Sequence, residues 1–181
     1  MLQNFLLFQI GWFSCVLGGA SNDYYLSGVI VVAAVIVIHL ARASNIQHEI
    51  ALIGITAIIG TVWDSSLTLA GLFVFANGVF YSGMVPLWII AMWALFATTL
   101  NVSMKWMKNK YLLASLFGAI GGPVAYYAGY RLGAVEFSNT LIALVAVGIG
   151  WAIIMPLLMV LTKRFNGYRS KRINSYGVNS V

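Results

Sequence analysis

The chain has 181 residues, of which 61% are hydrophobic and 8% charged, and its formal net charge is +6. Soluble domains are about half apolar and about a quarter charged, so this composition excludes a soluble globular domain. The length leaves no room for a soluble catalytic module beside a membrane part. The single cysteine, Cys15, excludes an internal disulfide and a metal site built from cysteines alone.

Five segments are apolar for long enough to cross a bilayer, which takes about 20 helical residues. They are residues 4–20, 24–42, 86–104, 112–132 and 139–161. No Lys or Arg precedes the apolar run of the first segment, so we expect a retained span and not a secretory signal. The sequence therefore predicts an all-α, polytopic transmembrane helix bundle over residues 1–161.

Residues 49–80 lie between the second and third of these segments and are long for one crossing but short for two. Two short crossings give seven spans with the N-terminus outside, whereas one broken crossing gives six spans with both termini inside. Asp64, Ser65 and Ser66 form a natural turn, in which Asp64 would cap a helix beginning near Leu67. The sequence therefore favours seven spans slightly, with six as the alternative.

Basic residues cluster in two places, the loop 104–110 and the C-terminal segment 162–181. Two predicted spans separate the clusters, so both can face the cytoplasm, where loops are rich in Lys and Arg. We therefore expect a cytoplasmic C-terminus, with residues 162–181 as a flexible basic tail. Such clusters beside apolar spans contact anionic headgroups, so membrane lipids are expected as partners and nucleic acid is not.

Small residues form a stripe along the predicted span 112–132. At about 100° per residue, one arc of the helix collects Ala114, Gly118, Gly122, Ala125, Gly129 and Gly133. In lipid, a stripe of this kind lets two helix backbones approach closely. We expect helix packing within the chain; contact with a membrane protein partner or a second copy of the chain, and the lining of a substrate path, are the alternatives.

Asp64 is one of only four acidic residues and is the main candidate for a ligand or ion site. A carboxylate at the centre of a bilayer costs at least about 2.5 kcal/mol, so its depth decides between a surface cap and a buried site. His39 and Arg131 are the available partners. Tyr126 and Tyr127 follow a predicted proline kink at a depth where their hydroxyls need partners, so they are candidate cavity residues.

Motifs for catalysis or cofactor binding are absent from the sequence. His39, His48 and Glu49 lack the spacing of a metal site, and neither a GxSxG elbow nor a phosphate-binding loop is present. We therefore expect no metal, no cofactor and, on balance, no enzymatic activity. Three functions follow in order: binding or transport of a small or lipidic ligand, a non-enzymatic scaffold that packs on a partner, and an intramembrane lipid-modifying enzyme.

Four stretches carry a resemblance to a known family: NFLLFQIGWFSCVLGGA, GTVWDSSL, PLWIIAMWALFATTL and GAIGGPVAYYAGYRLGAV. Over about residues 1–161 the chain resembles a family of small bacterial inner-membrane proteins of unknown function. This resemblance implies a multi-pass protein of the bacterial inner membrane, with no assigned activity or catalytic residues. Members of the family often lie near genes for lipid or fatty-acid modification, which implies a lipid-related role. The size and the six-span option are also similar to vitamin-binding subunits of energy-coupling transporters.

Overall fold

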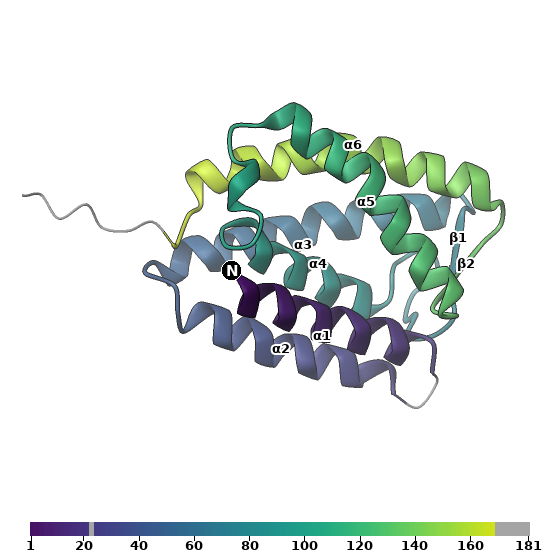
Figure 1. The fold of residues 1–181 in the computed structure, drawn as a ribbon. Helices are drawn as coiled ribbons and strands as arrows, with labels where there is room; N and C mark the ends of the chain where they lie inside the picture. The colour runs from purple at the N-terminus through teal and green to yellow at the C-terminus, as the bar shows by residue number, and fades with distance from the viewer. Residues whose placement is uncertain (22–23, 169–181) are drawn as a thin grey trace, which may run out of the picture.

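The computed structural model describes residues 1–21 and 24–168, which form a bundle of six α-helices that run alternately between its two ends (Figure 1). The helices are α1 (Leu2–Gly19), α2 (Tyr25–Leu40), α3 (Ile46–Leu69), α4 (Leu87–Leu100), α5 (Tyr111–Arg131) and α6 (Thr140–Arg164). The connections hold a short 3-10 helix, η1 (Lys105–Met107), and two strands, β1 (Phe73–Phe75) and β2 (Val135–Phe137). The prediction of an all-helical bundle is therefore confirmed apart from these short strands.

The segment 49–80 contains one helix and not two short crossings. α3 runs without a break, and Asp64 lies inside it with its side chain fully buried. The hydroxyls of Ser66 and Thr68 donate hydrogen bonds to backbone carbonyls about one turn earlier in the same helix. Their hydrogen-bonding needs are therefore met inside a continuous helix, and no break in the helix is required. The prediction that Asp64 caps a helix beginning near Leu67 is therefore wrong, and so is the division into two crossings on which seven spans depended.

The other five predicted spans are helical, but two of the helices are shorter than expected. α2 has 16 residues and α4 has 14, or about 24 and 21 Å of helix. α4 ends where the Asn101 side chain donates to Glu49 and to the Phe165 carbonyl, which fixes the chain as it leaves the helix. Three helices, α3, α5 and α6, are long and apolar enough to cross a membrane.

The distribution of side chains agrees with a lipid environment. Large apolar side chains are exposed on the outer faces of the long helices; Ile58, Val124 and Ile153 are 65%, 64% and 67% exposed. The interior instead holds polar side chains, namely His39, Glu49, Thr56, Asp64, Thr98, Thr99, Asn101 and Thr162. In water such a surface would be a large exposed apolar patch, whereas in lipid it matches the solvent. Each of these buried polar side chains other than Thr56 forms a hydrogen bond in the interior. Together with the three long apolar helices, this distribution indicates a membrane protein.

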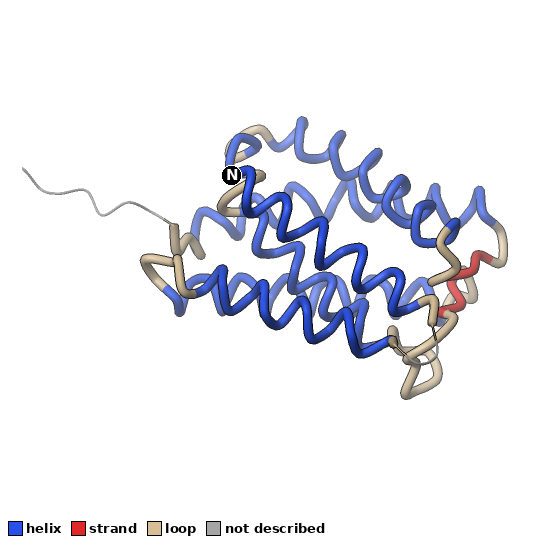
Figure 2. The backbone as a smooth tube through the Cα atoms, turned by 60° about the horizontal axis from the view of Figure 1, so that its bottom comes forward, coloured by secondary structure: helices blue, strands red, loops and turns tan. Residues whose placement is uncertain are grey.

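The two ends of the bundle differ in structure and charge. At one end β1 and β2 pair antiparallel, with Val74 opposite Glu136, and tie the segment after α3 to the segment after α5 (Figure 2). The other end holds the N-terminus, the basic loop around η1 and the end of α6 (Figure 1). Asn101 joins the last two, because it contacts both Lys108 and the Phe165 carbonyl. Most of the predicted tail, residues 169–181, lies outside the described residues.

Indole rings lie directly on glycines of neighbouring helices. A Cβ atom at Gly60 of α3 would overlap the ring of Trp93 of α4, and one at Gly122 of α5 would overlap the ring of Trp151 of α6. The two rings also stack on each other, with centroids 4.7 Å apart. These glycines therefore set how closely α4 approaches α3 and how closely α6 approaches α5.

We predict that Gly60→Ala destabilises the protein by about 1–3 kcal/mol, because the added methyl group must displace a packed indole ring. Gly54→Ala is the matched control on the same helix, since a Cβ there meets nothing within 4 Å. It should stay within about 1 kcal/mol of the parent chain. Unfolding in mild detergent, followed by circular dichroism, measures both. Equal stability of the two variants would contradict the role given to Gly60.

Candidate functional site

A cavity of about 370 Å³ lies among α1, α4 and α5, with single contributions from α3, α6 and both strands. Most of its wall is apolar, and much of it is aromatic. The lining includes Phe8, Gln9, Trp12, Val16, Asp64, Phe75, Trp88, Ile89, Met92, Trp93, Phe96, Phe117, Tyr126, Val135 and Trp151. Two lining residues of α5 are partly exposed, Phe117 at 41% and Val124 at 64%. The cavity wall therefore includes residues of α5 that also contribute to the apolar outer surface.

Asp64 forms the polar corner of this cavity. Its Oδ1 accepts a hydrogen bond of 2.6 Å from the Tyr126 hydroxyl, and its Oδ2 accepts one of 2.7 Å from the Trp93 indole N–H. Gly60 precedes Asp64 by about one turn on the buried face of α3. The ring of Trp93 rests on Gly60 and so brings its N–H to the carboxylate. Two neutral donors therefore hold a buried carboxyl group at the cavity wall.

The small-residue stripe serves two surfaces in the structure. Gly118 and Gly122 face α6, where a Cβ would overlap the backbone or the ring of Trp151. Part of the stripe lines the cavity, namely Gly118, Gly122, Ala125 and Gly129. Ala114 is buried as well, whereas Gly133 follows the end of α5, is exposed and has a positive φ of 81°. Gly118 and Gly122 thus take part in close helix packing and also line the cavity, while the substrate path that the sequence offered as an alternative stays a prediction.

Two of the five candidate ligand residues come together, Asp64 and Tyr126. Tyr127 is 41% exposed, and Arg131, also exposed, lies beside it at the end of α5. No hydrogen bond or ion pair found among the described residues joins Arg131 to Asp64. His39 lies at the other end of the bundle, where it bonds Glu49, about 22 Å along α3 from Asp64. Neither cation named as a partner of Asp64 is therefore close to it.

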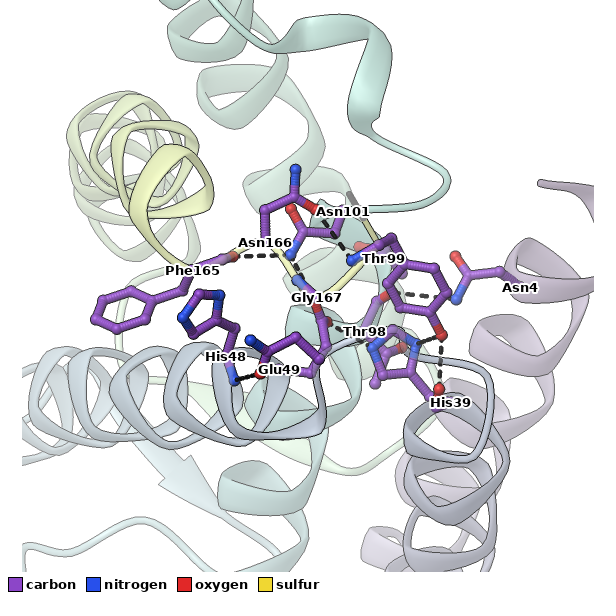
Figure 3. Close-up of polar contacts among 12 residues, drawn as sticks. Asn4, His39, His48, Glu49, Thr98, Thr99, Asn101, Phe165, Asn166 and Gly167 are labelled. Carbon is purple, nitrogen blue, oxygen red and sulfur yellow. Dashed lines mark hydrogen bonds and ion pairs between the residues drawn. The ribbon is translucent and has the colours of Figure 1, made fainter. Parts of the chain in front are cut away.

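A second polar cluster at the basic end is centred on Glu49, which is fully buried (Figure 3). Its Oε2 lies 2.7 Å from Nε2 of His39, and its Oε1 accepts from the Asn101 amide at 2.6 Å and from the Gly167 N–H at 2.7 Å. One carboxylate thus joins α2, α3, the end of α4 and the segment after α6. Sequence reasoning placed His48 and Glu49 at a membrane interface and did not name Glu49 as a site residue, although an acidic residue beside an apolar span signals such a pairing.

Tyr168 closes this cluster from outside the helices. Its hydroxyl donates to the His39 carbonyl at 2.6 Å and lies 3.2 Å from Nδ1 of the same residue. Burial, with a further contribution from the negative charge of Glu49, raises the pKa of the Tyr168 hydroxyl, which keeps it a donor. A smaller cavity of about 200 Å³ lies beside it, lined in part by His39, Arg42 and Tyr168. Within residues 1–21 and 24–168, no group of three His, Cys, Asp or Glu side chains is arranged to hold a metal ion.

Membrane-length apolar helices around buried carboxylates and an aromatic cavity define the chain as a membrane protein of the helix-bundle class. Residues 1–157 match the family described as "Protein of unknown function (DUF2878)", and the chain belongs to that family. The resemblance to a family of unknown function is thereby confirmed. No curated protein and no solved structure matches the chain.

We predict that Tyr126→Phe lowers the free energy of unfolding by about 1–3 kcal/mol, because it leaves Oδ1 of Asp64 buried without its donor. Tyr127→Phe is the matched control, since the neighbouring ring is partly exposed and makes no hydrogen bond to Asp64. It should change stability by less than about 0.5 kcal/mol. Chemical unfolding in detergent compares the two, and equal losses would contradict the assigned hydrogen bond.

Glu49→Ala should cost about 3–5 kcal/mol, because it leaves His39 and two buried donors without their partner. The control is Glu136→Ala, which removes an exposed carboxylate from β2 and should change stability by less than about 0.5 kcal/mol. Thermal unfolding of the purified variants measures the difference. A Glu49→Ala protein as stable as the control would show that the cluster does not hold the basic end together.

Proposed function

We propose that this protein binds a small, largely apolar ligand of lipid-like chemistry in the cavity beside Asp64. The observation that carries the proposal is an aromatic cavity whose wall includes Phe117 and Val124, which are also exposed on the apolar surface, so we place its opening there. A ligand dissolved in the bilayer can enter there without crossing water. The volume of about 370 Å³ lies in the range of about 300–1,000 Å³ that is common for small-molecule sites.

The proposal places the chain in the inner membrane of a bacterium, with the basic end in the cytoplasm. In support, Arg42, Lys108 and Arg164 lie at or near the ends of segments that meet at the basic end, and Arg131 lies at the other. Cytoplasmic loops are enriched in Lys and Arg, so this asymmetry favours a cytoplasmic C-terminus. The bacterial origin follows from the resemblance to inner-membrane proteins.

The two other functions considered from the sequence have weaker support. A scaffold that docks through the stripe would need an uncovered surface, but Trp151 of the same chain lies against Gly118 and Gly122. An intramembrane enzyme needs polar groups that converge on one pocket, and Asp64 and Tyr126 do so. Among the described lining residues, however, no serine, cysteine or histidine stands ready as a nucleophile or base. Ligand binding requires only what the cavity already has.

Filling the cavity should abolish binding. Gly121 lines the cavity, and a Cβ there makes only ordinary contact with Phe117, so Gly121→Phe places a ring in the open space. The matched control is Gly54→Phe, on the outer face of α3. The protein is labelled in nanodiscs with a long-chain alcohol that carries a photoactivatable diazirine, and mass spectrometry locates the adducts.

We expect adducts on cavity residues in the parent chain and in Gly54→Phe, and a loss of at least about tenfold in Gly121→Phe, because a filled pocket excludes its ligand. The thermal unfolding curve of each variant checks that it is folded. Adducts spread evenly over the outer helix faces, with the same yield in all three proteins, would contradict the proposed function.

A further inference from the structure

Within residues 1–21 and 24–168, no cationic side chain forms a hydrogen bond or an ion pair with the carboxyl group of Asp64. It is fully buried, and its two hydrogen bonds come from an indole N–H and a phenol O–H, both neutral. The structure treats the other buried carboxylate differently, since Glu49 is paired with His39. A carboxylate taken out of water is costly unless a positive charge and hydrogen bonds compensate it. Asp64 has the hydrogen bonds, and the cavity lies where the charge would be.

From this geometry we infer that the ligand carries one positive charge, an ammonium group that pairs with Asp64, on an otherwise apolar body. The inference rests on the function proposed above and names the chemical class of the ligand. Binding of such a ligand would convert a carboxylate held by neutral donors into one side of an ion pair that is shielded from water. An anionic ligand would be repelled at the same place, and a neutral one would leave the carboxylate unpaired.

The aromatic wall beside Asp64 suits the same charge. Trp93, which bonds the carboxylate, stacks on Trp151 at 4.7 Å, and Phe96 meets Trp151 edge-on at 5.2 Å. All three rings line the cavity, together with Tyr126. Trp93 also rests on Gly60 and Trp151 on Gly122, so the stacked pair covers its own faces and excludes water from the carboxylate. Charges attract each other more strongly where water is excluded, so this corner favours an alkylated or primary ammonium.

The rest of the cavity determines the rest of the ligand. Away from Asp64 the lining is apolar apart from Gln9, with Phe8, Val16, Ile89 and Met92 among its residues. The opening beside α5 faces the apolar surface, so a ligand that arrives through the bilayer must itself partition into lipid. These features together describe a cationic amphiphile: one ammonium head at Asp64 and a hydrocarbon or aromatic body along α1 and α4.

The test compares three brominated probes of equal chain length, an alkylamine, an alcohol and a carboxylate, in phosphatidylglycerol nanodiscs. Bromine quenches the tryptophans of the cavity, so quenching of fluorescence reports binding. In the parent chain the amine should bind at least about tenfold more tightly than the alcohol, and the carboxylate most weakly. Asp64→Asn should weaken the amine by at least about tenfold and leave the alcohol within about twofold.

Each outcome has one meaning. Equal affinity of amine and alcohol for the parent chain overturns the ammonium assignment, as does an amine affinity that Asp64→Asn leaves unchanged. In both cases the proposed function survives, provided that the alcohol still binds to the parent chain and that Gly121→Phe abolishes this binding. If Gly121→Phe affects none of the probes, the proposed function itself fails. Retained binding of the alcohol shows that Asp64→Asn is folded. The loss of amine affinity in Asp64→Asn separates pairing with the carboxylate from the general attraction of amines to anionic phosphatidylglycerol.

The ammonium can belong to a free amine or to a lipid headgroup, and a change of bilayer separates these sources. Adding phosphatidylethanolamine to the nanodiscs should lower the apparent affinity of the amine if the headgroup occupies the site. An unchanged affinity assigns the site to a free amine. Both results keep the assignment of a positive charge opposite Asp64.

Discussion

The contact of an indole ring with a helical glycine is the interaction on which the rest of the structure depends. Lipid gives helices no hydrophobic reason to associate, so close van der Waals packing must hold them together. Flat indole rings that lie on residues without a Cβ provide this packing between four pairs of helices. The contacts are Gly60–Trp93 between α3 and α4, Gly122–Trp151 between α5 and α6, Gly150–Trp63 between α6 and α3, and Gly19–Trp88 between α1 and α4. The same contact builds the site, because Trp93 reaches Asp64 only by lying on Gly60. The residues that pack the helices together therefore also form the site around Asp64.

The buried face of α3 carries two carboxyl groups that the fold treats in opposite ways. Glu49 has a histidine, an amide and a backbone N–H within hydrogen-bonding distance, contributed by three other parts of the chain. It fixes the basic end, and the segment after α6 that completes it lies beyond the family match at residue 157. In the part of the chain that the structure describes, Asp64 has only neutral donors, and it borders a cavity. The difference in partners, at similar burial, separates a group that supports the fold from the group to which we assign the proposed ligand.

The sequence predicted those features that depend on local pattern. Apolar length located the helices, and small residues at helical spacing located the close face of α5. Asp64 was found because a carboxylate in an apolar stretch is unusual, but its setting was misjudged: serines that bond back within a helix resemble a turn when only the sequence is visible. The partners of His39 and Asp64 could not be predicted in the same way. Asn101 and Gly167 are distant from Glu49 in sequence, and nothing local distinguishes a tryptophan that lies on a glycine from one at the membrane surface.

The two ends of the bundle also bear on the direction in which a ligand travels. At the basic end, the Glu49 cluster fills the space between α2, α3, α4 and the end of α6 with satisfied hydrogen bonds, and opening it would leave a buried carboxylate unpaired. At the other end, the pairing of β1 with β2 ties the segments after α3 and α5. The opening beside α5 needs neither to break. On the proposed function, a ligand would enter and leave through the bilayer side at little cost, whereas passage along the bundle axis would require the costlier cluster to part. This asymmetry favours binding of a membrane-dissolved molecule over its movement from one face of the membrane to the other.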